Sequence, residues 1–219
     1  MLLDKPAGMV VHADEGEKVN TLVNHLLAYL YQKREWNPRW ENAFTPALCN
    51  RIDRNTCGIV IAAKNAESLR ILNQKIRDRE LTKLYLCIAC GKVTPDSATL
   101  TAYLEKNSDT NTVKISDKKT KSNLTIKTKY KVLAYNGENS LLKVDLLTGR
   151  THQIRVHAAY MGHPVVGDKA YGYKNQRFKL DGQLLHAKKL EFTHPHTGEK
   201  MSFECELPDY FKKVLNLLA

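Results

Sequence analysis

Two short segments of the chain combine residue types that could carry chemistry. The first covers residues 50–58, where Asp53 stands between Arg51 and Arg54, just before an apolar run. Opposite charges nearby favour the ionised form of a carboxylate. The same residues allow a simpler interpretation, in which Asp53 accepts hydrogen bonds from backbone N–H groups of a turn, with help from Thr56. This segment alone does not decide between a reactive and a structural carboxylate.

The second segment covers residues 147–157 and reads Leu-Thr-Gly-Arg-Thr-His-Gln-Ile-Arg-Val-His. A predicted strand ends at Gly149, and a predicted helix starts soon after it. The first turns of that helix would carry Arg150, Gln153 and Arg155, whose N–H groups could hold a phosphate or a carboxylate. An ordinary basic helix start is the plain alternative.

The spacing of apolar residues indicates the elements that must position these segments. Helical spacing predicts a helix over about 19–30 with Asn20 as its N-cap, and further helices at about 66–79, at about 152–161 and from about 208 onward. Apolar runs predict strands at 9–11, 58–63, 84–90, 98–104, 125–133 and 141–147, and a hairpin of 186–192 with 201–205. Helices mixed with many strands, without regular alternation, indicate an α+β fold with a mixed, mainly antiparallel central sheet flanked by helices and loops.

Composition narrows the class of protein. The 219 residues carry a formal net charge of +11 and have a pI of about 9.4, which favours a polyanionic partner such as nucleic acid. No apolar run is long enough for a membrane span, and no signal peptide is recognisable. Five cysteines without a disulfide-like spacing favour a reducing cytoplasm. Cys87 and Cys90 form a CxxC within a predicted strand, where they would face opposite sides, so no metal site is expected.

Two basic stretches leave their role open. Residues 32–47 contain Trp36 and Trp40 among basic residues, so this loop could stack on RNA bases, or the tryptophans could pack onto the domain. Residues 114–131 are rich in lysine, and these charges could hold RNA or protect the edge of a sheet.

Together, the two segments resemble the RluA-type pseudouridine synthases in both pattern and order. Residues 50–58 resemble the motif His-Arg-Leu-Asp-x-x-Thr-Ser-Gly, with Asn50 in place of the histidine and Cys57 in place of the serine. Residues 148–157 resemble Thr-Gly-Arg-x-His-Gln-Ile/Leu-Arg-Val-His. Shorter matches lie at residues 5–8, 83–85, 162–168 and 185–187. The resemblance therefore covers nearly the whole chain.

The resemblance implies the pseudouridine synthase catalytic fold with a central cleft, in a single catalytic domain over residues 1–219. Family members usually have several more residues before the Lys-Pro-x-Gly turn, which here is formed by residues 5–8. Many also have a small N-terminal RNA-binding domain, for which this sequence has no counterpart. A catalytic domain with a truncated start, or a fragment, is therefore expected.

The implied reaction is the isomerisation of uridine within RNA. The N1–C1′ glycosidic bond breaks, the uracil turns, and C5 bonds to C1′, so neither a cofactor nor a metal is required. Asp53 is the expected catalytic carboxylate, either attacking C1′ or assisting elimination. Arg155 is its expected ion-pair partner. Tyr85 is expected to pack against the target base and to assist removal of the proton from C5.

The same resemblance implies contacts with RNA. Arg51 resembles an arginine that fills the gap left in the RNA stack by the extruded uridine. The other expected RNA-binding residues are Arg54, Thr56, Arg150, His152 and Gln153, and an apolar wall is expected from Leu147 and Ile154. The expected protein is a cytoplasmic monomer that modifies ribosomal RNA, with transfer RNA as the alternative substrate.

Two rival functions remain at this point. A binding-only protein would grip RNA as an assembly factor without catalysis, but the presence of Asp53, Tyr85 and Arg155 argues against it. A nucleoside or glycoside hydrolase usually needs a second acidic residue to protonate the leaving group or activate water. Asp168 is a candidate, although it follows Gly167 in what resembles a structural loop motif.

Overall fold

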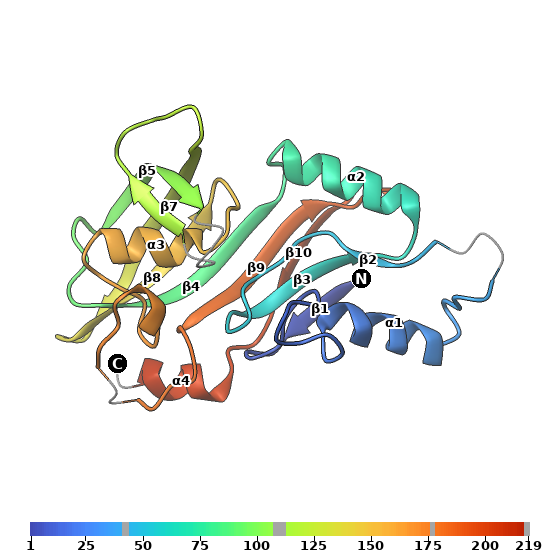
Figure 1. The fold of residues 1–219 in the computed structure, drawn as a ribbon, viewed down its shortest axis with the longest axis horizontal. Coiled ribbons are helices and arrows are strands. Elements are labelled where there is room, and N and C mark those ends of the chain that lie inside the picture. The colour runs from blue at the N-terminus through green and yellow to red at the C-terminus, as the bar shows by residue number, and fades with distance from the viewer. Residues whose placement is uncertain (41–43, 107–112, 176–177, 217–219) are drawn as a thin grey trace. The chain divides into compact units, whose positions relative to one another are not determined.

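The computed structural model describes residues 1–40, 44–106, 113–175 and 178–216. The chain divides into two compact units, each assembled from two stretches of sequence. Unit 1 consists of Met1–Thr82 and Lys189–Cys205, and unit 2 of Lys83–Lys188 and Glu206–Ala219. The fold is of the α+β kind, with mainly antiparallel strands and four α-helices in the described ranges (Figure 1).

Unit 1 is built around strand β3 (Cys57–Ala63), which pairs antiparallel with β1 (Leu2–Lys5) and with the short β2 (Ala47–Leu48). Strand β9 (Leu185–Thr193), whose last residues belong to this unit, is the other neighbour of β3 and forms a hairpin with β10 (Lys200–Glu204). The hairpin confirms the strand pair predicted for residues 186–192 and 201–205.

Strand β3 is buried along its whole length because a helix packs on each of its faces. Ile59 and Ile61 belong to the apolar cluster that contains Leu72 of α2 (Ala66–Arg77), whereas Ala62 packs with Leu26 of α1 (Leu22–Gln32). Since successive side chains of a strand point to opposite faces, a strand between two helical layers must be apolar at every position. The segment that carries Asp53 therefore leads into a strand that α1 and α2 hold in place from its two faces.

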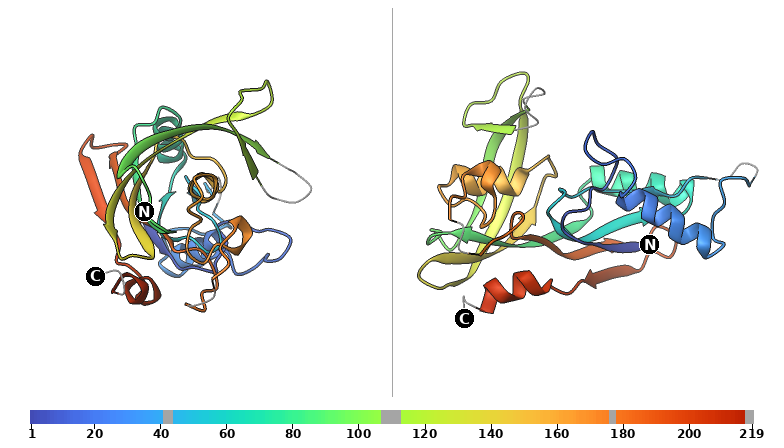
Figure 2. Two further views of the ribbon diagram at one scale, coloured as in Figure 1. Left: turned by 90° about the vertical axis from the view of Figure 1, so that its left-hand side faces the viewer. Right: turned by 60° about the horizontal axis from the view of Figure 1, so that its bottom comes forward.

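Unit 2 contains five antiparallel strands in the spatial order β4-β8-β7-β5-β6. Their bounds are β4 (Thr82–Cys90), β5 (Ser97–Lys106), β6 (Val113–Ser116), β7 (Leu124–Tyr135) and β8 (Asn139–Leu146). Helix α3 (Gln153–Tyr160) lies in the concave side of this sheet, where Val156 packs on Ile126 of β7 (Figures 1 and 2).

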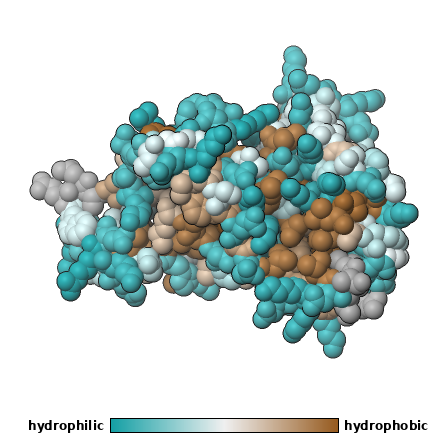
Figure 3. Space-filling model, turned by 180° about the vertical axis from the view of Figure 1, so that it is seen from behind, coloured by the Kyte–Doolittle hydropathy of each residue, from teal (hydrophilic) through white to brown (hydrophobic). Residues whose placement is uncertain are grey.

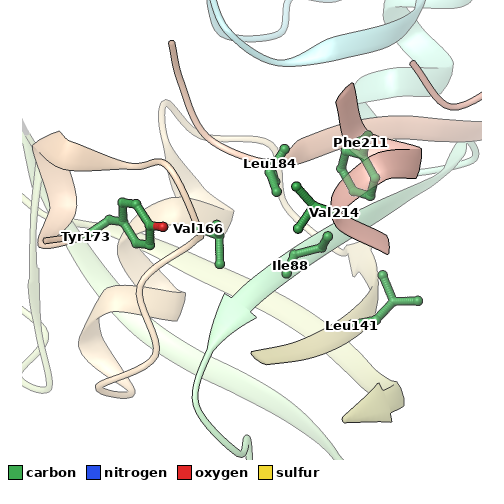
Figure 4. Packing of buried hydrophobic residues seen from close by; sticks show 7 residues of the cluster. All are labelled: Ile88, Leu141, Val166, Tyr173, Leu184, Phe211 and Val214. Atoms are coloured by element: carbon green, nitrogen blue, oxygen red, sulfur yellow. The ribbon is translucent and has the colours of Figure 1, made fainter. Parts of the chain in front are cut away.

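A second apolar cluster of unit 2 lies around Ile88 of β4. Phe211 and Val214 of helix α4 (Asp209–Asn216) pack on it, together with Leu184 and Val166 (Figure 4). Both Phe211 and Ile88 are fully buried. Most of the face drawn in Figure 3 is hydrophilic, and hydrophobic residues gather there in limited areas. None of the helices in the described ranges has the length and apolar character of a membrane span.

Two local predictions are wrong, and three short elements were not predicted. The strand expected at residues 9–11 is absent, because Val10 forms only an isolated bridge with Thr21, and the actual strand lies earlier, at Leu2–Lys5. The N-cap of α1 is Thr21 rather than Asn20, since the Thr21 side chain accepts a hydrogen bond from the N–H of Asn24. The short strands β2 and β6 and a 3-10 turn over Lys169–Tyr171 were not predicted. The remaining helices and strands agree with the predictions to within a few residues.

One buried histidine makes the stability of this fold depend on pH. His157 of α3 is buried, and its Nδ1 lies 2.7 Å from the hydroxyl of Thr128. Burial lowers the pKa of His157 from 6.5 to about 4. The folded chain thus keeps this ring neutral where the unfolded chain binds a proton. Its contribution to stability is complete above about pH 6.5 and falls by about 1.4 kcal/mol per pH unit as the pH drops towards 4.

We therefore expect His157→Gln to flatten the pH dependence of unfolding between pH 7 and pH 5. Urea denaturation at both values should show that the wild-type protein loses about 2 kcal/mol more than the variant. His25→Gln, which changes an exposed histidine of α1, is the matched control. Equal losses in wild type and His157→Gln would contradict the prediction.

Candidate active site

In unit 1, Asp53 lies in a turn that leads into β3. The N–H of Thr56 donates to the backbone carbonyl of Asp53 at 3.0 Å, which closes the turn. Thr56 is almost completely buried, Asp53 is half-buried, and Arg51 and Arg54 are exposed. A further hydrogen bond, from the N–H of Ile61 to the side-chain oxygen of Asn50 at 2.8 Å, anchors the start of the segment to β3.

The buried side chain of Lys5 holds the same turn in place through hydrogen bonds. Its side chain is fully buried, and its Nζ donates to the carbonyl oxygens of Pro6, Met9 and Arg54 at 2.7–2.8 Å. Burial lowers the pKa of Lys5 to about 8, while the charges of Cys57 and Asp53 oppose that shift. The ammonium thus ties the turn at residues 5–8 to the backbone of the residue that follows Asp53. Lys5 was recognised only as part of a family motif, and this structural role was not predicted.

This arrangement predicts a large cost for removing the ammonium group. In Lys5→Met three carbonyl oxygens lose their buried donor, so we expect a loss of about 3 kcal/mol in the free energy of unfolding. Urea denaturation at pH 7 measures this loss. Lys18→Met, at an exposed lysine of the same unit, should leave stability nearly unchanged. A Lys5→Met protein as stable as wild type would show that water replaces the ammonium at no cost.

Arg54 forms an ion pair on the surface of unit 1. Its Nη2 lies 2.9 Å from Asp14 Oδ2 and 3.1 Å from Asp14 Oδ1, and both side chains are substantially exposed. The Asp14 carboxylate has a lowered pKa: its hydrogen bonds with Arg54 and with the N–H groups of Glu17 and Gly16 outweigh the effect of desolvation. An exposed pair of this kind contributes little stability.

The loop before β2 contains two tryptophans, for which the sequence allowed either packing onto the domain or stacking on RNA bases. Trp36 packs on the cluster of Leu26 and Leu30 beneath α1, as the packing interpretation predicts. Trp40 is 52% exposed. Residues 41–43 lie outside the described ranges.

In unit 2, the second motif begins helix α3, and its polar residues are oriented by the neighbouring strand. Gln153 is buried, and its Nε2 donates to the Lys127 carbonyl and to the Thr128 hydroxyl. Its Oε1 accepts from the Thr148 hydroxyl and from the Arg150 N–H. The RNA contact expected of Gln153 is therefore revised: both ends of its amide hold the loop that presents Arg150, which is itself exposed.

Arg155 is held by a carboxylate that the sequence did not assign to it. Its Nε donates to Asp168 Oδ2 at 2.6 Å and its Nη2 to Asp168 Oδ1 at 2.8 Å, and the side chains are only 9% and 1% exposed. The guanidinium also lies over the ring of Tyr171, 4.9 Å from its centroid. A bidentate, buried pair of this kind fixes both the position and the plane of the guanidinium.

Two further residues complete this cluster. His152, in the left-handed conformation with φ of 54°, places its Nδ1 2.8 Å from the Tyr171 hydroxyl. Gly167 precedes Asp168 with φ of +85°, and a Cβ at this position would lie 2.2 Å from the Gly182 carbonyl oxygen. Only glycine fits there, so the Gly-Asp pair of the sequence marks the turn that delivers Asp168 to Arg155.

The remaining expected residues of unit 2 lie on and near β4. Tyr85 is buried on β4, opposite Val144 of β8. The neighbouring Lys83 has its Nζ 3.4 Å from the position of a Cβ on Gly149, and burial lowers the pKa of Lys83. Ile154 is buried and Leu147 is half-buried. Unit 1 thus carries Arg51, Asp53, Arg54 and Thr56, and unit 2 carries Tyr85, Arg150, His152, Gln153 and Arg155.

Comparison with solved structures defines the class of fold. Human RNA Pseudouridylate Synthase Domain Containing 4 superimposes with a TM-score of 0.79, at 21% sequence identity, over 99% of this chain and 88% of that one. Human RNA Pseudouridylate Synthase Domain Containing 1 gives a TM-score of 0.69 at 24% identity, over 99% and 90%. The fold is therefore that of the pseudouridylate synthases.

Sequence comparison then gives the family. The family model described as RNA pseudouridylate synthase matches residues 1–160. The RNA pseudouridine synthase YlyB of Bacillus subtilis is 33% identical over 225 residues, covering 100% of this chain and 69% of the relative. Ribosomal large subunit pseudouridine synthase D of Nitrosomonas europaea is 32% identical, over 100% of this chain and 62% of the relative. The chain belongs to the RNA pseudouridylate synthase family, whose members are isomerases, and it spans about two thirds of the length of these relatives.

Proposed function

We propose that this chain converts specific uridines of RNA to pseudouridine, with Asp53 as the catalytic carboxylate and Arg155 as its ion-pair partner. The observation that carries the proposal is the buried guanidinium of Arg155 in the second motif, which Asp168 and Tyr171 hold in place. A guanidinium carries five N–H donors, so the two that bind Asp168 do not prevent a pair with a second carboxylate. A cation beside a carboxylate favours its charged form, which is the form that can act on the sugar.

The proposed chemistry follows from the charge that develops on the sugar. As the N1–C1′ bond breaks, the ribose acquires positive character, and a carboxylate beside C1′ can trap it or assist elimination. The uracil then turns and bonds to C1′ through C5. The C5 proton leaves and N1 gains a proton, so the product is an isomer of uridine and the scheme uses no cofactor. Tyr85 supplies a ring against which the base packs and a hydroxyl that assists loss of the C5 proton.

RNA binding is assigned to exposed cations and to the groups that orient them. Arg51, Arg54 and Arg150 are exposed and can contact phosphates or fill the gap in the stack. Thr56, His152 and Gln153 support these contacts indirectly, because the first and third are buried and the second is bonded to Tyr171. We place all these residues in a single catalytic domain that acts as a monomer.

Ribosomal RNA is the proposed substrate and transfer RNA the alternative. The relatives from Nitrosomonas europaea and Pseudomonas aeruginosa are both named ribosomal large subunit pseudouridine synthase D, which supports the first choice. The test is to map pseudouridines in ribosomal and transfer RNA from cells with and without this gene. We expect at least one ribosomal RNA site to disappear with the gene and to return when it is restored. Identical maps would refute the enzymatic proposal and favour a binding-only protein.

A further inference from the structure

The outer face of the unit 2 sheet carries an ordered group of lysines. Lys127, Lys129 and Lys131 of β7 are exposed, and so is Lys143 of β8; we call these four residues the lysine face. The residues between them on β7 point the other way, since Thr128 bonds to Gln153 and His157 of α3. Because side chains alternate along a strand, the lysine face lies on the side of the sheet opposite to α3.

The strand register gives this face a regular pattern of donors. On β5, Ser97 pairs with Lys131, Thr99 with Lys129 and Thr101 with Lys127, and all three hydroxyl residues are exposed. Each lysine of β7 therefore has a hydroxyl group beside it, and successive lysines are about 7 Å apart. Ammonium and hydroxyl groups are the side chains that contact phosphate oxygens in nucleic-acid complexes.

The face also carries a net positive charge. Lys131 lies directly opposite Lys143, a like-charge pair that disfavours the sheet. The half-buried Asp145, opposite Lys129, is the acidic residue within this pattern. Among the described residues, no ion pair is formed by any of the four lysines. Repulsion among these lysines lowers the stability of the free protein. A bound polyanion would turn the same charges into favourable contacts.

Edge protection does not explain these lysines. Charged residues protect strands whose hydrogen-bonding edge is exposed, but β7 pairs with β5 on one side and with β8 on the other. Of the two roles that the sequence left open for this stretch, phosphate binding is the one that fits an interior strand.

We propose that the lysine face is a second RNA contact, which binds the phosphate backbone of a segment flanking the target uridine. Lys127 connects it to the motif loop, because its N–H donates to the Thr148 hydroxyl and the Arg150 N–H donates to Gln153, which in turn binds the Lys127 carbonyl. The contact rests on the proposed function for its RNA substrate, but it takes no part in the chemistry. The lysine face should therefore change the affinity for RNA and not the rate of pseudouridine formation in the bound complex.

The test compares two variants that lower the net charge equally. One replaces the lysine face by glutamine at all four positions; the other replaces four scattered exposed lysines by glutamine, namely Lys18, Lys174, Lys200 and Lys213. Binding to a 20-base-pair RNA hairpin is measured at several KCl concentrations. We expect the lysine-face variant to bind roughly tenfold to a hundredfold more weakly at moderate salt, with a salt dependence shallower by about 3 in log–log slope. The scattered variant should stay close to wild type.

Three outcomes would overturn the proposal. One is wild-type affinity and slope in the lysine-face variant, and another is an equal effect in the scattered variant, which would reduce the contact to net charge. The third is weaker binding to heparin with unchanged binding to RNA, which would assign the face to another polyanion. Single-turnover pseudouridine formation at saturating RNA separates this proposal from the function itself. We expect that rate to be unchanged in the lysine-face variant, whereas an inactive wild-type chain would refute the proposed function alone.

Discussion

Replacing Asp53 by asparagine should abolish pseudouridine formation while leaving the fold and RNA binding intact. An amide has nearly the same size as the carboxylate, but it carries no charge to stabilise the developing positive sugar. Loss of a catalytic carboxylate or nucleophile typically lowers a rate by roughly 10⁴-fold or more. The measurement is a single-turnover assay at saturating RNA, with the amount of pseudouridine read directly from the product.

Asp14→Asn is the matched control for this experiment. Asp14 is also an aspartate of unit 1, but it is exposed and pairs with Arg54 at the surface. Its loss should reduce the rate by less than about threefold, because an exposed ion pair contributes little. If Asp53→Asn kept normal activity, the assignment of the catalytic carboxylate would be wrong. If both variants lost activity equally, a general effect on the charge of unit 1 would explain the result.

The second large effect is expected from Asp168→Asn. This change removes the charge that holds Arg155 through two hydrogen bonds in a buried site. Breaking one side of a buried pair costs about 3–5 kcal/mol, so the free energy of unfolding should fall by that order. We also expect the rate of the bound complex to fall by roughly 100-fold to 1,000-fold, because a positioned cation acts on the reacting charge.

A purely structural role for Asp168 would give a different pattern. Loss of folded protein lowers the fraction that binds RNA, whereas a misplaced Arg155 lowers the rate in the fraction that still binds. Titration with labelled RNA measures that fraction, and the single-turnover rate is then corrected for it. Asp181→Asn, at an exposed aspartate of unit 2, serves as the comparison. A normal corrected rate in Asp168→Asn would show that the pair with Arg155 serves the fold and not the reaction.

The sequence was most informative where burial is one-sided or complete. Periodicity located α2 and the apolar run of β3 because their packing repeats over several residues. It failed at β1, whose four residues include the buried Lys5, a residue type that is rarely found inside. The three carbonyl groups that make this burial possible come from residues 6, 9 and 54, and no local pattern brings them together.

The same limit applies to the candidate site. The motifs predicted which residues matter, and Arg155 was among them, but not what holds them. Its partner Asp168 follows 13 positions later, after a turn that depends on Gly167 meeting the Gly182 carbonyl. Gln153 was expected to face RNA, yet the packing of α3 on β7 turns its amide inward. The direction in which such a side chain points is set by tertiary contacts, and the sequence alone does not reveal these contacts.

The pairing of β3 with β9 has a consequence for biosynthesis. The two strands are neighbours in space, although β9 follows β3 only after more than a hundred residues of chain. At ribosomal speeds of about 5–20 residues per second, β3 waits roughly 10 seconds for that partner. Throughout this interval a strand with seven apolar or small residues has one open edge, so the nascent polypeptide must be shielded from its neighbours until the hairpin of β9 and β10 has left the ribosome.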